Sequence, residues 1–173
     1  IPVSEDRLKK YQSLVLTQLA VPLKLLTLTH PSDGHVTVCF IGPVLNKDID
    51  ALKNEIQQCV MSLSIAPFYL TCATVAPFPH ASSHLSAMMI DSSPVLMALN
   101  QALRSVATEW EVEPERHAFR PHVSLLRTQQ VTASVPEITL PTLTRWLVDR
   151  LCIYESRSQA RGPRYRVIDE ILL

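Results

Sequence analysis

One short pattern occurs twice in the chain and constrains its fold more strongly than any other feature. Residues 35–38 read His-Val-Thr-Val and residues 122–125 read His-Val-Ser-Leu, so about half of the 173 residues separate the two copies. Polar and apolar residues alternate in both copies, which is typical of a β-strand with one buried face. The repetition predicts two structurally related halves, each of which contributes one polar strand face to a shared cleft.

The predicted polar faces carry the side chains needed for acid–base chemistry. His35 and Thr37 would emerge together from the first strand, and His122 and Ser124 together from the second. In an in-line displacement at a phosphodiester, a neutral imidazole takes the proton of the attacking oxygen and a protonated imidazole supplies one to the leaving oxygen. The hydroxyls can hold the non-bridging oxygens. The pattern therefore predicts a phosphodiester-cleaving cleft with no metal ion, no cofactor and a bell-shaped pH dependence.

Arg127 is the next polar residue of functional interest on the second strand. Strict alternation places Arg127 on the face opposite to Ser124, unless the strand ends or bulges between them. From the residues alone, a surface arginine at the end of the strand and a phosphate contact both remain open.

The other histidines lack this pattern. His30 and His117 have no hydroxyl partner in a strand, and each precedes a predicted turn or strand. His80 and His84 are four residues apart, a spacing that binds metal on a helix, but the neighbouring prolines and serines favour an exposed loop instead. The sequence also contains no G-x-S-x-G elbow, no glycine-rich phosphate loop and no carboxylate cluster. These absent motifs argue against a serine hydrolase, a P-loop enzyme or a two-metal nuclease.

Hydrophobic periodicity and turn residues divide the remaining chain into helices and strands. Helices are expected over residues 4–19, 46–63 and 94–109. Strands are expected over residues 23–29, 36–41, 68–75, 85–90 and 118–127, followed by a long hairpin of residues 147–154 and 165–172. In the strand over residues 36–41, Val36, Val38 and Phe40 are expected to face the core. A chain of 173 residues fits one domain, so residues 1–173 are expected to form a single unit.

Charge and cysteine usage indicate the environment of the protein. The 16 basic and 16 acidic residues cancel, but residues 145–166 hold six arginines against two carboxylates. That run fits either a solvated strand edge or a contact with a polyanion. The four cysteines are widely spaced among apolar residues and are expected to be buried free thiols in a reducing cytoplasm. No apolar stretch is long enough for a transmembrane helix, and a monomer is the default expectation.

The two motifs resemble those of the 2H phosphoesterase superfamily, which is defined by two H-x-[ST]-x motifs. The resemblance is strongest to the bacterial RNA 2',3'-cyclic phosphodiesterases, also called 2'-5' RNA ligases. Residues 40–42 match the F-L-G that follows the first motif in that family, and residues 121–127 match P-H-[IV]-[ST]-L-x-R. The family's closing S-x-x-x-x-x-G-x-x-Y hairpin is matched by Ser156 or Ser158 together with Gly162 and Tyr165.

The resemblance implies an α+β fold of two pseudo-symmetric lobes, each with an antiparallel sheet and flanking helices, around a cleft. It implies hydrolysis of RNA 2',3'-cyclic phosphate ends to 2'-phosphomonoesters, with His35 as proton donor and His122 as proton acceptor. Thr37, Ser124 and Arg127 would bind the phosphate. The same groups, run backwards or with another nucleophile, would join RNA ends through a 2'-5' link. The substrates would be RNA ends or nucleotides that carry a 2',3'-cyclic phosphate, with no membrane partner.

Two alternatives and one departure from the family accompany this hypothesis. The chain could be a nucleotide-binding 2H module without turnover, or a 2H exonuclease that trims RNA 3' ends. The arginine-rich hairpin is a further expected contact with the RNA backbone. The family's first strand is reduced here to a possible stub of residues 1–3, which indicates either a truncated sequence or a lost strand.

Overall fold

We describe the fold from a computed structural model. The structure describes residues 1–19, 22–80, 83–111, 118–128, 137–157 and 164–173. Within these residues the helices are α1 (Glu5–Leu16), α2 (Ile49–Ser62) and α3 (Pro94–Glu109), with short 3-10 helices η1 (Leu23–Leu25), η2 (Pro31–Asp33) and η3 (Asn46–Asp48). The strands are β1 (Leu26–Leu28), β2 (Phe68–His80), β3 (Ser83–Ile90), β4 (His122–Thr128), β5 (Ile138–Val148), β6 (Arg150–Arg157) and β7 (Arg164–Leu172).

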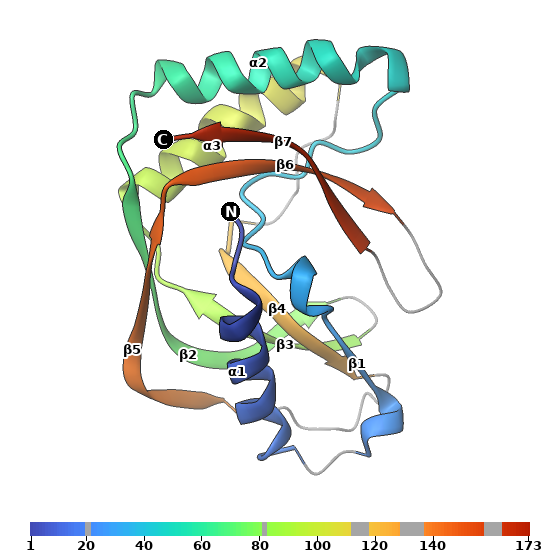
Figure 1. Cartoon of the computed structure of the whole chain (residues 1–173), viewed down its shortest axis with the longest axis vertical. Coiled ribbons are helices and arrows are strands. Elements are labelled where there is room, and N and C mark those ends of the chain that lie inside the picture. The colour runs from blue at the N-terminus through green and yellow to red at the C-terminus, as the bar shows by residue number, and fades with distance from the viewer. Residues whose placement is uncertain (20–21, 81–82, 112–117, 129–136, 158–163) are drawn as a thin grey trace.

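The strands form two antiparallel sheets. One has five strands in the order β1-β4-β3-β2-β5, and the other is the hairpin β6-β7. The chain passes from the first sheet to the second at Asp149, between β5 and β6 (Figure 1). The α+β class with antiparallel sheets is therefore confirmed.

Helix α1 packs against the five-stranded sheet (Figure 1). Its buried stripe of Leu8, Tyr11 and Val15 repeats at helical spacing, and Glu5 lies in the first turn, where the helix dipole favours a negative charge. The buried side chain of Gln12 donates hydrogen bonds to the carbonyl oxygens of Thr29 (2.6 Å) and Leu125 (2.9 Å). These two bonds attach the helix to the backbone of β4 and to the residue that follows β1.

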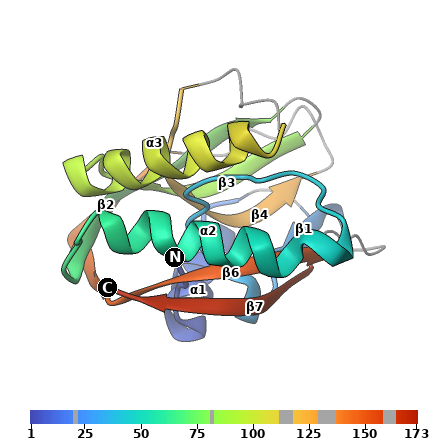
Figure 2. The same ribbon diagram turned by 90° about the horizontal axis from the view of Figure 1, so that it is seen from above.

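Helices α2 and α3 lie side by side and cover the part of the molecule that contains β6 and β7 (Figure 2). The Ser93 hydroxyl caps α3 by accepting the amide N–H of Leu96 at 3.1 Å. The buried Asn100 on the same helix donates a hydrogen bond to the carbonyl oxygen of Val38 at 2.6 Å. Helix α3 thus holds the main chain at the last residue of the first motif.

Three predictions about strands are corrected by the structure. Residues 36–41 do not form a regular strand, because the first motif makes only the isolated bridges Pro2–His35 and Val36–Val123. Phe40 is 59% exposed, although Val36 and Val38 are buried as predicted. The region around His80 and His84, predicted as a loop, is instead the end of β2 and the start of β3.

Strand β5 was not predicted from the sequence. Pro141 within it and Pro136 just before it obscure the strand pattern. Proline is tolerated there because β5 is an edge strand.

The cysteines are less buried than predicted. All four are free thiols, but only Cys72 is buried, and the other three are partly exposed. No helix in the described ranges is long and apolar enough to cross a membrane.

Candidate active site

The two motifs meet through a single antiparallel bridge between Val36 and Val123. In such a pairing the residues on either side of the bridge are cross-strand neighbours, so position 35 lies opposite position 124 and position 37 opposite position 122. Both valines are fully buried. The four polar side chains therefore share the opposite face, where each histidine has the hydroxyl residue of the other motif as its neighbour.

Each imidazole is oriented by the main chain of its own motif. His35 Nδ1 lies 2.8 Å from the carbonyl oxygen of Asp33, and His122 Nδ1 lies 2.9 Å from the carbonyl oxygen of Arg120. Because a carbonyl oxygen can only accept a hydrogen bond, the proton of each neutral ring lies on Nδ1. Nε2 is therefore the nitrogen that can exchange a proton with a substrate, and in His35 it lies 3.1 Å from the Thr37 hydroxyl.

The rings that surround the two histidines differ. His35 packs against two tyrosines of the β6-β7 hairpin, with its ring centroid 5.2 Å from that of Tyr154 and 4.5 Å from that of Tyr165. His122 stacks on Phe78 of β2, with centroids 3.9 Å apart and ring planes inclined at 23°. The sequence did not predict Phe78 or Tyr154 as site residues, because their contacts depend on strand order rather than on a local motif.

Burial lowers the pKa of His35. Removal of the ring from water disfavours its charged form, and this effect outweighs the opposing hydrogen bond from Nδ1–H to the Asp33 carbonyl. His122 makes a smaller contribution that lowers the pKa of His35 in the same direction. In the free protein, His35 is therefore mainly neutral at pH 7.

The lowered pKa of His35 predicts a loss of stability in mild acid. The unfolded chain binds a proton at this histidine near its ordinary pKa of about 6.5, whereas the folded protein binds it only at lower pH, so stability falls as the pH drops from about 6.5 to the folded-state pKa. We expect the urea midpoint to fall less between about pH 7.5 and 5.5 in His35→Asn than in the wild-type protein. Equal losses in the two proteins would contradict this assignment.

A β-bulge places Arg127 on the cleft face. The pairing of β4 with β3 shifts there, because Ala87 lies opposite Ser124 while Ser86 lies opposite Leu126. Leu125 is the extra residue, and both Leu125 and Leu126 are fully buried, although they are consecutive.

The register on the far side of the bulge confirms the change of face. Position 85 pairs with Arg127 in β4 and with Phe78 in β2. Positions 85 and 87 share a face by ordinary alternation, so Arg127 lies on the same face as Ser124. Phe78, which stacks on His122, also pairs with position 85 and therefore lies on this face in register with Arg127. The structure thus brings all five predicted site residues to one face: His35, Thr37, His122, Ser124 and Arg127.

A cavity of about 610 Å³ opens beside His35. His35, Thr37 and the two tyrosines line one part of it, and residues 38–44, helix α2 and strand β6 line the rest with mainly aliphatic side chains. The site therefore combines a polar face with an adjoining apolar space.

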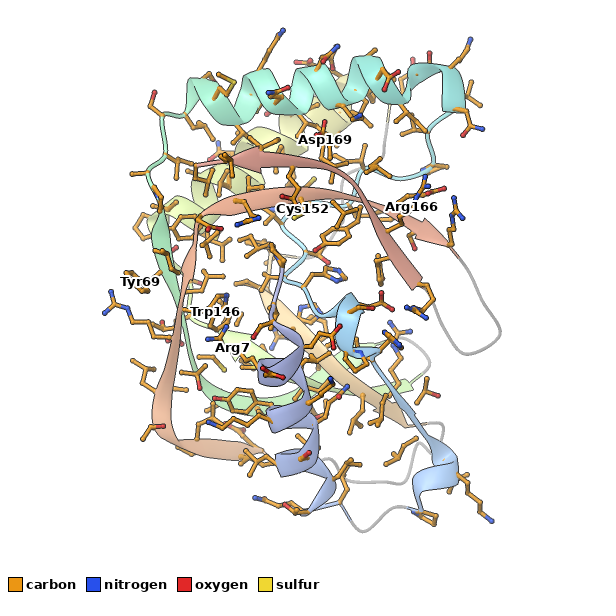
Figure 3. All side chains as sticks on the ribbon, in the orientation of Figure 1. Arg7, Tyr69, Trp146, Cys152, Arg166 and Asp169 are labelled. Atoms are coloured by element: carbon orange, nitrogen blue, oxygen red, sulfur yellow. The ribbon has the colours of Figure 1, made fainter. Side chains whose placement is uncertain are left out.

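The arginines of residues 145–166 are largely neutralised by neighbours. Arg150 pairs with Asp149 and Glu170, both Arg157 and Arg166 pair with Glu155, and Arg164 pairs with Asp33. Arg145 lies over the ring of Tyr69, 3.7 Å from its centroid, and Tyr69 points outward from the sheet (Figure 3). Arg161 lies outside the described residues. These pairs weaken the argument for the hairpin as a contact for RNA phosphates, which stays a prediction.

A family model described as the 2'-5' RNA ligase superfamily matches residues 22–160. The chain belongs to this superfamily. The matched region includes both motifs, Arg127 and most of the two sheets. Membership in this superfamily of phosphoesterases supports an enzymatic role. Among curated proteins, no sequence matches the chain.

Solved structures share the fold of this superfamily member. TT0787 of Thermus thermophilus is 18% identical, with a TM-score of 0.77 over 98% of this chain and 91% of its own. LigT of E. coli complexed with 3'-AMP is 20% identical, with a TM-score of 0.72 over 98% of this chain and 90% of its own. A protein described as a phosphoesterase is also 20% identical, with a TM-score of 0.76 over 100% of this chain and 94% of its own. At these identities the likeness establishes the fold.

Proposed function

We propose that the protein hydrolyses RNA 2',3'-cyclic phosphodiester ends to 2'-phosphomonoesters without a metal ion. The observation that carries this proposal is the bridge between Val36 and Val123, which sets an imidazole of each motif on one polar face. An in-line displacement requires a base for the attacking oxygen and an acid for the leaving oxygen on opposite sides of the phosphorus. We propose that the Nε2 atoms of His35 and His122, which lie on this shared face, supply this acid and this base.

In the proposed reaction, each histidine transfers one proton. His122 Nε2 takes a proton from water as the water oxygen bonds to phosphorus. His35 Nε2 gives its proton to the 3'-oxygen as the bond between phosphorus and that oxygen breaks, and the phosphate stays on the 2'-oxygen. Thr37, Ser124 and Arg127 hold the non-bridging oxygens, whose charge grows in the transition state.

The low pKa of His35 in the free protein is compatible with its role as the acid. An anion close to an imidazole stabilises the protonated form and raises its pKa. Binding of the substrate phosphate therefore favours the protonated form of His35, so the acid carries its proton when the substrate is bound. With the 5'-hydroxyl of a second RNA in place of water, the same groups would catalyse its attack on the cyclic phosphate, and cleavage of the bond between phosphorus and the 3'-oxygen would leave a 2'-5' linkage.

Nucleotides are the ligand class that the relatives support. E. coli LigT has been crystallised with 3'-AMP, with phosphate and with ATP. We propose the same class of ligand here, with the phosphate between the two histidines.

The test is incubation with a 2',3'-cyclic nucleotide, and with RNA that ends in a cyclic phosphate, in the presence of a chelator. We expect a 2'-phosphomonoester, identified by phosphorus NMR, at a rate that the chelator leaves unchanged. A 3'-phosphate product or a requirement for metal would contradict the mechanism. Shortening of a linear RNA would indicate a 3'-end exonuclease, and tight nucleotide binding without product would indicate a binding module.

A further inference from the structure

Asp33 connects the first motif to the β6-β7 hairpin. It is the last residue of η2, and its side chain is only 2% exposed. Its carboxylate accepts a hydrogen bond from Arg164 Nε at 2.6 Å and another from the main-chain N–H of Tyr165 at 3.3 Å. Its main-chain carbonyl accepts the Nδ1–H of His35. One buried residue therefore contacts the imidazole and fixes the start of β7.

The contacts of Asp33 determine the surroundings of His35 on two sides. The carbonyl sets the ring tautomer and the direction of Nε2. The carboxylate holds the backbone of Tyr165, whose ring lies edge-on against His35 at 4.5 Å. A change in the position of η2 would alter both the hydrogen bond at Nδ1 and the aromatic contact.

Arg164 strengthens this connection from the other strand. Its Nη2 lies 3.3 Å from His30 Nδ1 and 3.5 Å from the Ser32 hydroxyl, so the guanidinium contacts three residues of the turn that precedes the motif. His30 Nδ1 also accepts the N–H of Ser32, which closes the turn. The Arg164 side chain is 41% exposed, whereas the Asp33 side chain is nearly fully buried. Removal of Arg164 would leave the buried Asp33 carboxylate without its ion pair, whereas removal of Asp33 would leave an arginine that water can reach.

The second motif has a similar arrangement with weaker contacts. Arg120 also precedes its histidine by two residues and accepts the histidine's Nδ1–H through its carbonyl. Its guanidinium lies 5.2 Å from the centroid of Phe78, the ring that stacks on His122. Both motifs thus use the residue two positions before the histidine to set the tautomer and to contact the residue whose ring packs against that histidine. Only in the first motif is that residue a buried carboxylate.

The geometry points to Asp33 as a positioning residue for His35 in the reaction proposed above. It touches no substrate atom and acts by holding the imidazole and Tyr165 in one arrangement. This inference rests on the proposed function for its kinetic consequence, but its structural consequence at His35 does not depend on turnover.

The test compares Asp33→Ala, Asp33→Asn and the wild-type protein with a 2',3'-cyclic nucleotide. We expect Asp33→Ala to lower kcat by about 10- to 100-fold with little change in KM, because a displaced catalytic group loses orientation rather than substrate affinity. Asp33→Asn is expected to recover much of kcat, because its amide oxygen can still accept the N–H groups of Arg164 and Tyr165. Asp149→Ala is the matched control, because Asp149 also pairs with an arginine at 2.9 Å but lies exposed at the start of the hairpin.

A second readout follows the ring nitrogens of His35 by nitrogen NMR. We expect one tautomer with the proton on Nδ1 in the wild-type protein and a mixture of tautomers in Asp33→Ala. If Asp33→Ala does not fold, as judged by its thermal transition, Arg164→Gln replaces it and is expected to shift both readouts in the same direction. A folded variant with wild-type kcat, a change in KM alone, or an unchanged His35 spectrum would overturn the inference. Absence of turnover in the wild-type protein would instead reject the proposed function, and the NMR comparison would still test Asp33.

Discussion

Replacement of either histidine by alanine is expected to abolish nearly all hydrolysis of a 2',3'-cyclic nucleotide. General acid and general base catalysis each contribute about 10² to 10⁴ in rate, so His35→Ala and His122→Ala should each lower kcat by about 10³ or more. KM should change much less, because the proposed phosphate ligands Thr37, Ser124 and Arg127 are retained. Initial rates under saturating substrate provide the measurement.

The double variant separates a joint mechanism from two independent contributions. If the two imidazoles act in one proton-transfer step, His35→Ala/His122→Ala should be about as inactive as either single variant. Circular dichroism and the thermal transition must remain close to those of the wild-type protein, since the histidines lie on the polar side of the buried bridge. Retention of turnover in either folded single variant would reject the two-histidine mechanism.

Loss of Arg127 is expected to produce the second largest effect. The bulge at Leu125 turns Arg127 toward the face that carries Ser124, where its guanidinium can pair with the substrate phosphate. Removal of one such charge-stabilising donor costs about 10² to 10³ in rate, so Arg127→Ala should lower kcat/KM by about 10². Arg127→Lys should recover only part of this loss, because an ammonium cannot form the two parallel hydrogen bonds of a guanidinium.

The matched control for Arg127 is Arg145. Arg145 is also an arginine on a strand of the same sheet, but its guanidinium is stacked on Tyr69, and it lies outside the predicted site. Arg145→Ala should leave kcat/KM within about 2-fold of the wild-type value, since surface substitutions far from a site have small effects. Equal losses in the two alanine variants would mean that general positive charge, rather than a specific phosphate contact, explains the result.

Local patterns were sufficient to predict the two motifs and the main helices. The alternation in residues 35–38 and 122–125 predicted which side chains share a face, and the register at Val36 and Val123 agrees with that prediction. The apolar stripes predicted α2 and α3 within a few residues of their observed ends. These features follow from the regular repeat of helices and strands, which the spacing of apolar residues in the sequence shows directly.

Features that depend on pairing between distant segments could not be predicted. The bulge that turns Arg127 arises from the register between β3 and β4, and one extra residue reverses the face that alternation assigns. Asp33 and Arg164 are 131 residues apart in the sequence, so no local pattern predicts that they pair. The exposure of Phe40 follows from the end of regular pairing after Val36, which leaves that segment without the alternation expected of a strand.

The bridge between Val36 and Val123 also limits how the protein can distinguish the two ends of its substrate. Two motifs that meet antiparallel at one residue each are related by a local dyad, as two identical surfaces are in an isologous dimer. A phosphate on that dyad meets an imidazole and a hydroxyl from either direction, so the four motif residues alone cannot decide which ribose oxygen faces which histidine. In the proposed reaction that choice comes from groups that break the symmetry, which include Arg127 beside the second motif, the tyrosines against His35 and the phenylalanine against His122. For the proposed reaction, we therefore expect substitution of these aromatic rings to change the ratio of 2'-phosphate to 3'-phosphate product before it stops the reaction.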